Sequence, residues 1–347
     1  MMIECMPLVV GIPGLELTPE ELETLETIQP AGVILFERNV ASADQVRDLV
    51  AHLVELDPRP FVAVDLEGGA VNRLRPIWGE LPSAAEAAAA GRRAVGALGE
   101  AVGAACRNLG RHLDLAPGVA RDRPHGLIAR QRRAMAADPE RVAVLARVFN
   151  KGLASWGVRG CLKHFPGLGE IPVDTHDELP TIDAPADEID QQIRVFAELS
   201  AEIPIVMVGH VIVPALGDGL VPASLSPAAV RRAARLPGSP IVLSDDIEMG
   251  ALAGCGDLPD RVESALAARI HGVLVCKAFD RLPEIAAHLT ERMATDSSLS
   301  SRMLEMAACM GTLRRDLLRN AAAVPAPDDT TVAQLWERAR CEASAKG

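Results

Sequence analysis

Short apolar runs alternate with longer amphipathic segments along almost the whole chain. Eight of these runs are rich in Val, Ile and Leu, and they lie at 7–12, 31–36, 61–65, 113–117, 159–163, 204–209, 240–245 and 272–276. Runs that are so short and so continuously apolar are typical of parallel strands covered on both faces. The pattern therefore predicts eight strands of one parallel sheet.

Segments with a helical pattern lie between the runs, among them 19–28, 43–56, 139–156, 186–202 and 258–269. Before the first of these, Thr18 is a good N-cap and Pro19 suits the first helical turn. A strand followed by a helix, repeated eight times, predicts an α/β protein with a single (β/α)8 TIM-type barrel. The alternative is a doubly wound open sheet, which normally carries a glycine-rich phosphate-binding turn, and Gly-Ile-Pro-Gly after the first run does not match that motif.

Two further segments complete the expected organisation. The alanine-rich stretch 84–110 predicts one long helix on the outside of the barrel, and we place the barrel itself in residues 1–320. A turn-rich sequence, AAAVPAPDDTT, then leads into a polar helical pattern. We expect residues 321–347 to form a hinge and a short helical tail, which either packs on the bottom of the barrel or frays.

Composition narrows the classes of function. The chain has six Phe, three Trp and no Tyr, and its net charge is −12, so we expect neither an aromatic platform for nucleic acid nor binding to another polyanion. Its seven cysteines form no CxxC pair, which favours buried thiols in a reducing compartment over a disulfide framework or a zinc site. We find no membrane-spanning run and no signal-peptide pattern, so we expect a cytoplasmic protein without a membrane partner.

Ionisable residues follow several of the predicted strands. In a TIM barrel, the functional groups lie at the C-terminal ends of the strands and in the loops after them. The residues at these places are Asp65 and Glu67 after the third strand, Lys163, His164, Asp174 and His176 after the fifth, His210 after the sixth, and Asp245 and Asp246 at the end of the seventh. They predict a polar site at the mouth of an otherwise aliphatic barrel.

Three chemistries fit such a ring of groups. A metal-dependent hydrolase would use His and Asp clusters, although the closely spaced His-x-His of such barrels is missing. A Schiff-base aldolase would use Lys163 with a depressed pKa. A glycosidase would use Asp245 as nucleophile, with a second proton-transfer group across the anomeric carbon. Composition and spacing leave these three possibilities open.

Four motifs resemble glycoside hydrolase family 3, namely AGVILFERNV, FVAVDLEGGAVNRLRP, CLKHFPGLGEIPVDTHDELP and IVLSDDIEMGAL. They are most similar to the compact, single-domain bacterial β-N-acetylhexosaminidases of that family, and they occur in order between about residue 7 and about residue 280. The resemblance implies a retaining exo-β-N-acetylglucosaminidase that removes terminal β-linked N-acetylglucosamine through a covalent glycosyl-enzyme. It further implies a carbohydrate or muropeptide substrate from cell-wall recycling, no metal or organic cofactor, and a monomer or homodimer.

The same resemblance assigns the catalytic residues. Asp245 matches the nucleophile, and Asp174 and His176 match a catalytic pair in which the aspartate orients a histidine acid/base. Residues i and i+2 of an extended loop project to the same side, so the carboxylate of Asp174 can raise the pKa of the imidazole. Asp246 is the competing candidate for the nucleophile, but we expect it to point to the opposite side because successive strand residues alternate.

The resemblance also implies the substrate contacts. Asp65, Arg73, Arg133, Lys163 and His164 match residues that bind the non-reducing sugar, and His210 and Met249 match residues that line the pocket. The local pattern around Arg133 departs from the family, so Arg130 and Arg132 are alternatives. Four further residues depart from the family pattern, namely Leu66, Ala70, Leu168 and Glu170. We expect these departures to change the docking of the catalytic loop and the substrate preference more than the reaction.

Two alternatives remain at this stage. Family members that act on β-glucosides or β-xylosides typically have a second domain that supplies a carboxylic acid/base. We expect no such domain here, and the chain keeps Asp174 and His176, so the hexosaminidase is favoured. The other alternative is a catalytically weak sugar-binding barrel, because the loop that carries this pair is altered.

Overall fold

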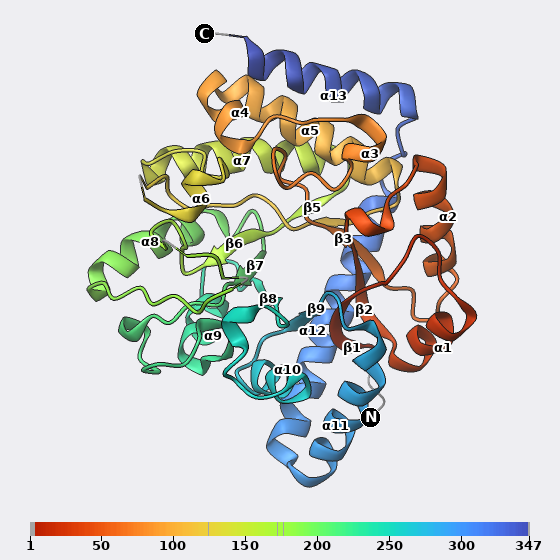
Figure 1. The fold of residues 1–347 in the computed structure, drawn as a ribbon, viewed down its shortest axis with the longest axis vertical. Helices are drawn as coiled ribbons and strands as arrows, with labels where there is room; N and C mark the ends of the chain where they lie inside the picture. Colours follow the sequence, from red (N-terminus) through yellow and green to blue (C-terminus); the bar gives the residue numbers. More distant parts are fainter. Residues whose placement is uncertain (1–3, 124, 172, 176, 346–347) are drawn as a thin grey trace.

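The computed structural model describes residues 4–123, 125–171, 173–175 and 177–345. Within them one parallel sheet has the strand order β5-β4-β3-β2-β1-β9-β8-β7-β6. Its strands are β1 (Met6–Gly11), β2 (Pro30–Leu35), β3 (Phe61–Val64), β4 (Leu113–Asp114), β5 (Arg159–Gly160), β6 (Leu162–Phe165), β7 (Ile205–Val208), β8 (Ile241–Asp246) and β9 (Gly272–Val275). The two strands at the ends of this order are separated in the chain only by Cys161. The sheet therefore closes on itself, and the prediction of a TIM-type barrel is confirmed (Figure 1).

The fifth predicted strand, 159–163, is two short strands instead of one. β5 pairs with β4, whereas β6 pairs with β7 on the other side. The chain stays bonded to the segment after β4, because the N–H groups of Cys161 and Lys163 donate to the carbonyls of Ala116 and Pro117. The barrel thus keeps eight strand positions, and β5 and β6 share one of them.

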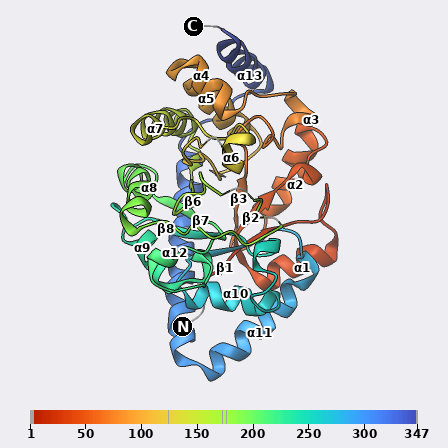
Figure 2. The same ribbon diagram turned by 60° about the vertical axis from the view of Figure 1, so that its left-hand side comes forward.

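Helices alternate with the strands and surround the barrel (Figures 1 and 2). They are α1 (Pro19–Ile28), α2 (Ala43–Val54), α3 (Arg75–Trp78), α4 (Ala84–Ala90), α5 (Arg92–Asn108), α6 (Leu127–Arg130), α7 (Pro139–Ser155), α8 (Ala186–Leu199), α9 (Pro227–Ala234), α10 (Leu258–Ala267), α11 (Leu282–Thr295), α12 (Ser297–Ala322) and α13 (Asp329–Ser344). The five helices predicted by range begin at the predicted residues. At the first of them, the Thr18 side chain accepts the N–H of Glu21 and the Glu21 side chain accepts that of Thr18, which completes a capping box.

The long alanine-rich helix predicted over 84–110 is wrong, because two helices occupy this stretch. Gly91, with φ of 107°, ends α4 and precedes α5. This conformation is readily available only to glycine, and it turns the chain by an angle that a continuous helix does not allow. Both helices still pack on the outside of the barrel, where α5 lies against α7.

Two apolar clusters build the core. One lies between the strands and the outer helices, and the other fills the barrel with side chains such as Val9, Ile34 and Phe61. Helix α12 contacts β1, β2, β3 and β8 and adds Met310 and Leu317 to the inner cluster, so this helix closes one end of the barrel.

The C-terminal tail forms α13, which packs on α5 and α4 at one extreme of the molecule (Figure 1). The tail was expected either to pack on the bottom of the barrel or to fray. It does not pack on the bottom, where α12 already closes the end of the barrel, and it does not fray, because α13 has buried side chains. No helix in the described ranges has both the length and the apolar character that crossing a bilayer requires.

Candidate active site

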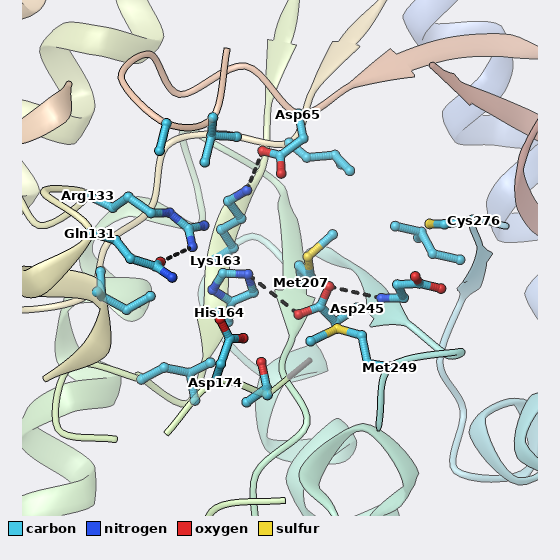
Figure 3. Close-up of a pocket in the computed structure, with 18 of the residues that line it drawn as sticks. Asp65, Gln131, Arg133, Lys163, His164, Asp174, Met207, Asp245, Met249 and Cys276 are labelled. Carbon is cyan, nitrogen blue, oxygen red and sulfur yellow. Dashed lines mark hydrogen bonds and ion pairs between the residues drawn. The ribbon is translucent and has the colours of Figure 1, made fainter. Parts of the chain in front are cut away.

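A cavity of about 380 Å³ opens where the strands end. Its walls come from the ends of β2, β3, β6, β7, β8 and β9 and from the loops after β4 and β6. The volume falls in the usual range for small-molecule sites, about 300–1,000 Å³. Most of the predicted site residues lie on these walls, including Asp65, Lys163, His164, Asp174 and Asp245 (Figure 3).

Asp245, the second-last residue of β8, presents its carboxylate to the cavity. Its Oδ2 lies 3.5 Å from Nε2 of His164, and its Oδ1 accepts the N–H of Asp246 at 2.9 Å (Figure 3). Burial acts to raise the pKa of Asp245, but His164, His210 and the Asp246 N–H together hold this pKa below its usual value. The carboxylate is therefore ionised at neutral pH and available for nucleophilic attack.

Asp246 also lines the cavity, but its Oδ1 accepts the N–H of Glu248 at 3.2 Å, whereas the Asp245 carboxylate lies against His164. The pairing of β8 with β9 shifts register between Leu243 and Asp246, and this irregularity breaks the simple alternation of side chains. Burial and the charge of Glu248 raise the pKa of Asp246 to about 6. The two neighbouring carboxyl groups thus have opposite pKa shifts in one pocket.

His164 follows a cis peptide bond after Lys163, and both side chains line the cavity. Burial lowers the pKa of His164 to about 4, although the charge of Asp245 acts in the other direction. The imidazole is therefore neutral at neutral pH. At that pH it lies as an uncharged group next to the Asp245 carboxylate.

A buried ionic network lies beside this pair. Nζ of Lys163 is 2.5 Å from Oδ1 of Asp65 and 2.7 Å from Oε1 of Glu67. Nη2 and Nε of Arg133 lie 2.5 Å and 3.1 Å from the two carboxylate oxygens of Glu67. Burial acts to raise the pKa of Glu67, but Arg133 and Lys163 outweigh it and lower that pKa. Glu67 thus fixes both cations in place.

The sequence places Glu67 in the predicted ring of ionisable residues, but no catalytic or sugar-binding role was predicted for it. Its side chain is 3% exposed and it does not itself line the cavity. Its position two residues after Asp65 was the available signal, because residues i and i+2 of an extended segment share a side.

The arginine alternatives separate clearly in space. Arg133 lines the cavity, whereas Nη2 of Arg132 lies 3.2 Å from Glu86 and Nη1 of Arg130 donates to the carbonyl of His125. Arg73 also lines the cavity, with Nη2 3.7 Å from Oδ2 of Asp65.

Met249 and His210 differ in position. Met249 lines the cavity. His210 is fully buried and lies outside the cavity wall. Its Nδ1 is 2.7 Å from Oγ of Ser224, and its Nε2 is 2.8 Å from the carbonyl of Asp246. His210 therefore supports the end of β8, behind the two carboxylates.

The segment after β6 brings Asp174 to the cavity. The carbonyl of Asp174 accepts the N–H groups of Asp177 and Glu178 at 3.0 Å, which makes a tight turn. Thr175 is buried, and its carbonyl accepts the N–H of Ala251. His176 lies outside the described residues, so its pairing with Asp174 stays a prediction.

Comparison with known proteins identifies the family. Residues 6–305 match the model of the glycosyl hydrolase family 3 N terminal domain. The chain belongs to glycosyl hydrolase family 3. As a member of this family it is a glycoside hydrolase.

Relatives in family 3 match over most of their length. A beta-hexosaminidase of Stenotrophomonas maltophilia is 34% identical over 323 residues, which cover 90% of this chain and 92% of the relative. A beta-hexosaminidase of Xanthomonas campestris pv. campestris is 33% identical over 323 residues, with 90% and 93% covered.

Solved family 3 structures share the fold. NagZ from Neisseria gonorrhoeae, in complex with N-trifluoroacetyl-D-glucosamine, aligns with a TM-score of 0.72 at 27% identity, over 97% of this chain and 90% of that one. M tuberculosis LpqI aligns with a TM-score of 0.75 at 28% identity, over 87% and 91% of the two chains.

Two departures from the family 3 pattern lie in the loop after β6. Leu168 is buried and lines the cavity, and Glu170 forms an ion pair with Arg123, Nε to Oε1, at 3.0 Å. The loop docks on the start of α6, because the N–H of Leu127 donates to the carbonyl of Ile171 at 2.8 Å. The altered loop is therefore fastened to the segment that carries Arg133.

The other two departures lie after β3. Leu66 is fully buried in the outer core, and its N–H donates to Oδ1 of Asp114. Ala70 is exposed at the wall of the cavity. In the part of the chain that the structure describes, no three His, Cys, Asp or Glu side chains are grouped so as to hold a metal ion.

Proposed function

We propose that this glycoside hydrolase is a retaining β-N-acetylglucosaminidase that removes terminal β-linked N-acetylglucosamine. The observation that carries the proposal is the ionised, largely buried Asp245 carboxylate on the wall of a cavity with a sugar-sized volume. The names of the relatives, beta-hexosaminidase and NagZ, support the choice of an N-acetylated sugar.

Asp245 is the nucleophile in this proposal. One carboxylate oxygen forms a bond to the anomeric carbon while the bond from that carbon to the aglycone oxygen breaks. A nucleophile must be unprotonated, and the lowered pKa of Asp245 keeps it so across the neutral range. Water then attacks the anomeric carbon from the opposite side, releases Asp245 and restores the original configuration.

The acid/base in this proposal is His176, oriented by Asp174. His176 donates a proton to the departing aglycone oxygen and later takes one from the attacking water. His164 is a poor alternative because its imidazole lies 3.5 Å from Asp245, on the side of the sugar from which the nucleophile attacks. The leaving group departs on the opposite side, and in this proposal the loop after β6, which brings Asp174 to the cavity, supplies the acid/base there.

Five residues bind the non-reducing sugar in this proposal, namely Asp65, Arg73, Arg133, Lys163 and His164, and Met249 packs against the ring. Charged side chains that are already held in place by ion pairs lose little conformational entropy when they bind the hydroxyls of a sugar. The 2.5–2.7 Å contacts of Lys163 with Asp65 and Glu67 are of that kind.

We further propose an acidic aglycone, as in muropeptide fragments, and a cytoplasmic role in cell-wall recycling. Muropeptides carry carboxylates on their lactyl and peptide parts. Lys277 is exposed where it lines the cavity, and its backbone is fixed because the N–H groups of Lys277 and Ala278 donate to Glu248. A cation at this position favours a negatively charged aglycone.

The test compares chromogenic β-N-acetylglucosaminide, β-glucoside and β-xyloside substrates. We expect turnover of the acetamido sugar only, and we expect Asp245→Asn to abolish it with the fold intact. A fluorinated N-acetylglucosamine donor should then label the peptide that contains Asp245 in a mass spectrum. Labelling of another side chain, or equal turnover of the three sugars, would refute the proposal.

The acidic aglycone has its own test. Lys277→Met should raise KM about five-fold for a substrate with a carboxylate on the aglycone, the equivalent of about 1 kcal/mol. It should leave KM for the neutral nitrophenyl substrate unchanged. Equal effects on both substrates would exclude recognition of the acidic group by Lys277.

A further inference from the structure

Helix α13 lies beyond residues 6–305, which match the family model, yet it is firmly packed. Its side chains Val332, Trp336 and Ala339 are buried against the rest of the protein. Near its start, Nδ2 of Asn108 donates to Oδ1 of Asp329 at 2.9 Å, and near its end Arg93 pairs with Glu342 at 2.7 Å. Contacts at both ends thus fasten α13 to the barrel.

Trp336 connects this helix to the loop between β3 and α4. The side chain is 1% exposed, and its indole N–H donates to the carbonyl of Glu80 at 3.1 Å. Its ring centroid lies 5.6 Å from that of Trp78, at an interplanar angle of 44°. Buried tryptophans normally satisfy their N–H in this way, and aromatic pairs at this distance attract each other.

The loop that Trp336 contacts carries Asp65 and Arg73 into the cavity. Bonds across the loop make it one braced unit. Nδ2 of Asn72 donates to the carbonyl of Gly79 at 2.9 Å, and Nη2 of Arg75 donates to the carbonyl of Gly69 at 3.1 Å. A shift at Trp78 or Glu80 is therefore transmitted to Arg73.

The position of the Arg73 side chain depends on the backbone of this loop more than the positions of Lys163 and Arg133 do. Its Nη2 lies 3.7 Å from Oδ2 of Asp65, which is longer than a hydrogen bond, and its guanidinium lies 5.9 Å from the ring centre of Phe36, near the outer limit of a cation–π contact. We propose that Trp336 is a positioning residue, which holds the loop so that Arg73 and Asp65 meet the non-reducing sugar. The proposal rests on the sugar contacts of the proposed function.

The test replaces Trp336 in the full-length protein. Trp336→Ala should lower kcat/KM for the chromogenic β-N-acetylglucosaminide on the order of 10-fold, mainly through KM, because sugar binding is impaired and Asp245 is untouched. Trp336→Phe, which keeps a ring against Trp78, should restore most of the loss. Val332→Ala is the matched control, since it removes buried volume from α13 but leaves the indole contacts in place. It should lower Tm while KM stays within about two-fold.

Hydrogen exchange of residues 67–82 gives a readout that needs no substrate. Trp336→Ala should speed exchange in this segment more than Val332→Ala does. Unchanged exchange, or equal effects of both variants on KM, would overturn the proposal. If Trp336→Ala does not fold, Trp336→Leu keeps apolar volume and serves in the same comparison. A wild-type protein that turns over no N-acetylglucosaminide would refute the proposed function, and the exchange result would still decide whether α13 holds the loop.

Discussion

Replacing Glu67 by Gln removes a negative charge from a buried place where two cations lie against it. The carboxylate accepts from Nε and Nη2 of Arg133 at 3.1 Å and 2.5 Å, and Lys163 lies 2.7 Å away. Gln offers one carbonyl oxygen and one amide NH₂, so at least one cation then faces a donor. Both cations lose a negative charge that offsets part of the cost of their burial.

The expected loss of stability follows from these contacts. Removing one partner from a buried ion pair costs about 3–5 kcal/mol, and we expect the lower end, about 3 kcal/mol, because Lys163 keeps Asp65. An unfolding entropy of about 2.1 cal/mol/K per residue gives roughly 0.7 kcal/mol/K for 347 residues, so Tm should fall by about 4 °C.

The loss should also depend on pH. The pKa of Glu67 lies below its usual 4.5 in the folded protein, so its stabilising contribution is complete above that value. The contribution is lost as the pH falls through the folded pKa. The difference in Tm between wild type and Glu67→Gln should therefore be largest at neutral pH and shrink below about pH 4.5.

Scanning calorimetry at pH 7 and at pH 4 measures this difference. The control is Glu80→Gln, the same substitution in the same loop, where Glu80 forms an exposed pair with Nε of Arg75 at 2.7 Å. An exposed pair contributes less than about 1 kcal/mol, so this variant should change Tm by about 1 °C or less. Equal Tm values for the two variants at pH 7 would refute the reasoning, since burial would then not increase the stabilisation that the carboxylate provides.

Three further predictions concern the cavity and its loops. Asp246→Asn should stabilise the protein by up to about 3 kcal/mol at pH 7.5, because a folded pKa of about 6 against a usual 3.8 makes ionisation unfavourable. The gain should vanish below about pH 4, and an unchanged Tm at pH 7.5 would contradict this prediction. Gly126→Ala places a Cβ 1.9 Å from the carbonyl oxygen of Gly169 and should lower kcat/KM about 100-fold, because it forces the two loops apart. The control is Gly254→Ala, whose added Cβ has nothing within 4 Å, and it should match wild type in the same assay. His164→Ala removes a group that lowers the pKa of Asp245, so the acid limb of the kcat/KM profile should move to higher pH, and an unmoved limb would exclude the contact.

The arrangement of strands and helices was predictable from local patterns. Short Val- and Ile-rich runs and capped helical segments identified the barrel, and helix starts such as Pro19 and Pro139 were found at the residue. These signals depend on neighbours in the chain, so the sequence alone carries them. The pattern did not detect the break at Gly91, because hydrophobic periodicity does not report a single backbone angle.

The sequence predicted which residues belong to the candidate site, but not how their side chains are arranged in space. Family motifs and the ends of strands selected Asp245, Lys163 and Asp65. They did not indicate that Asp246 lines the same cavity, because the register shift in β8 depends on pairing with β9, a strand from a distant part of the chain.

Long-range contacts alone decided the remaining features. Glu67 became a central group because Arg133 and Lys163, 66 and 96 residues away along the chain, meet its buried side chain. The position of α13 depends on its packing against α5 and α4, which come from a distant part of the chain. The sequence by itself determined which chemical groups follow each strand, since that is a matter of chain order. Their charges, pKa values and mutual distances were decided by the tertiary structure, because burial and pairing depend on every segment that folds around them.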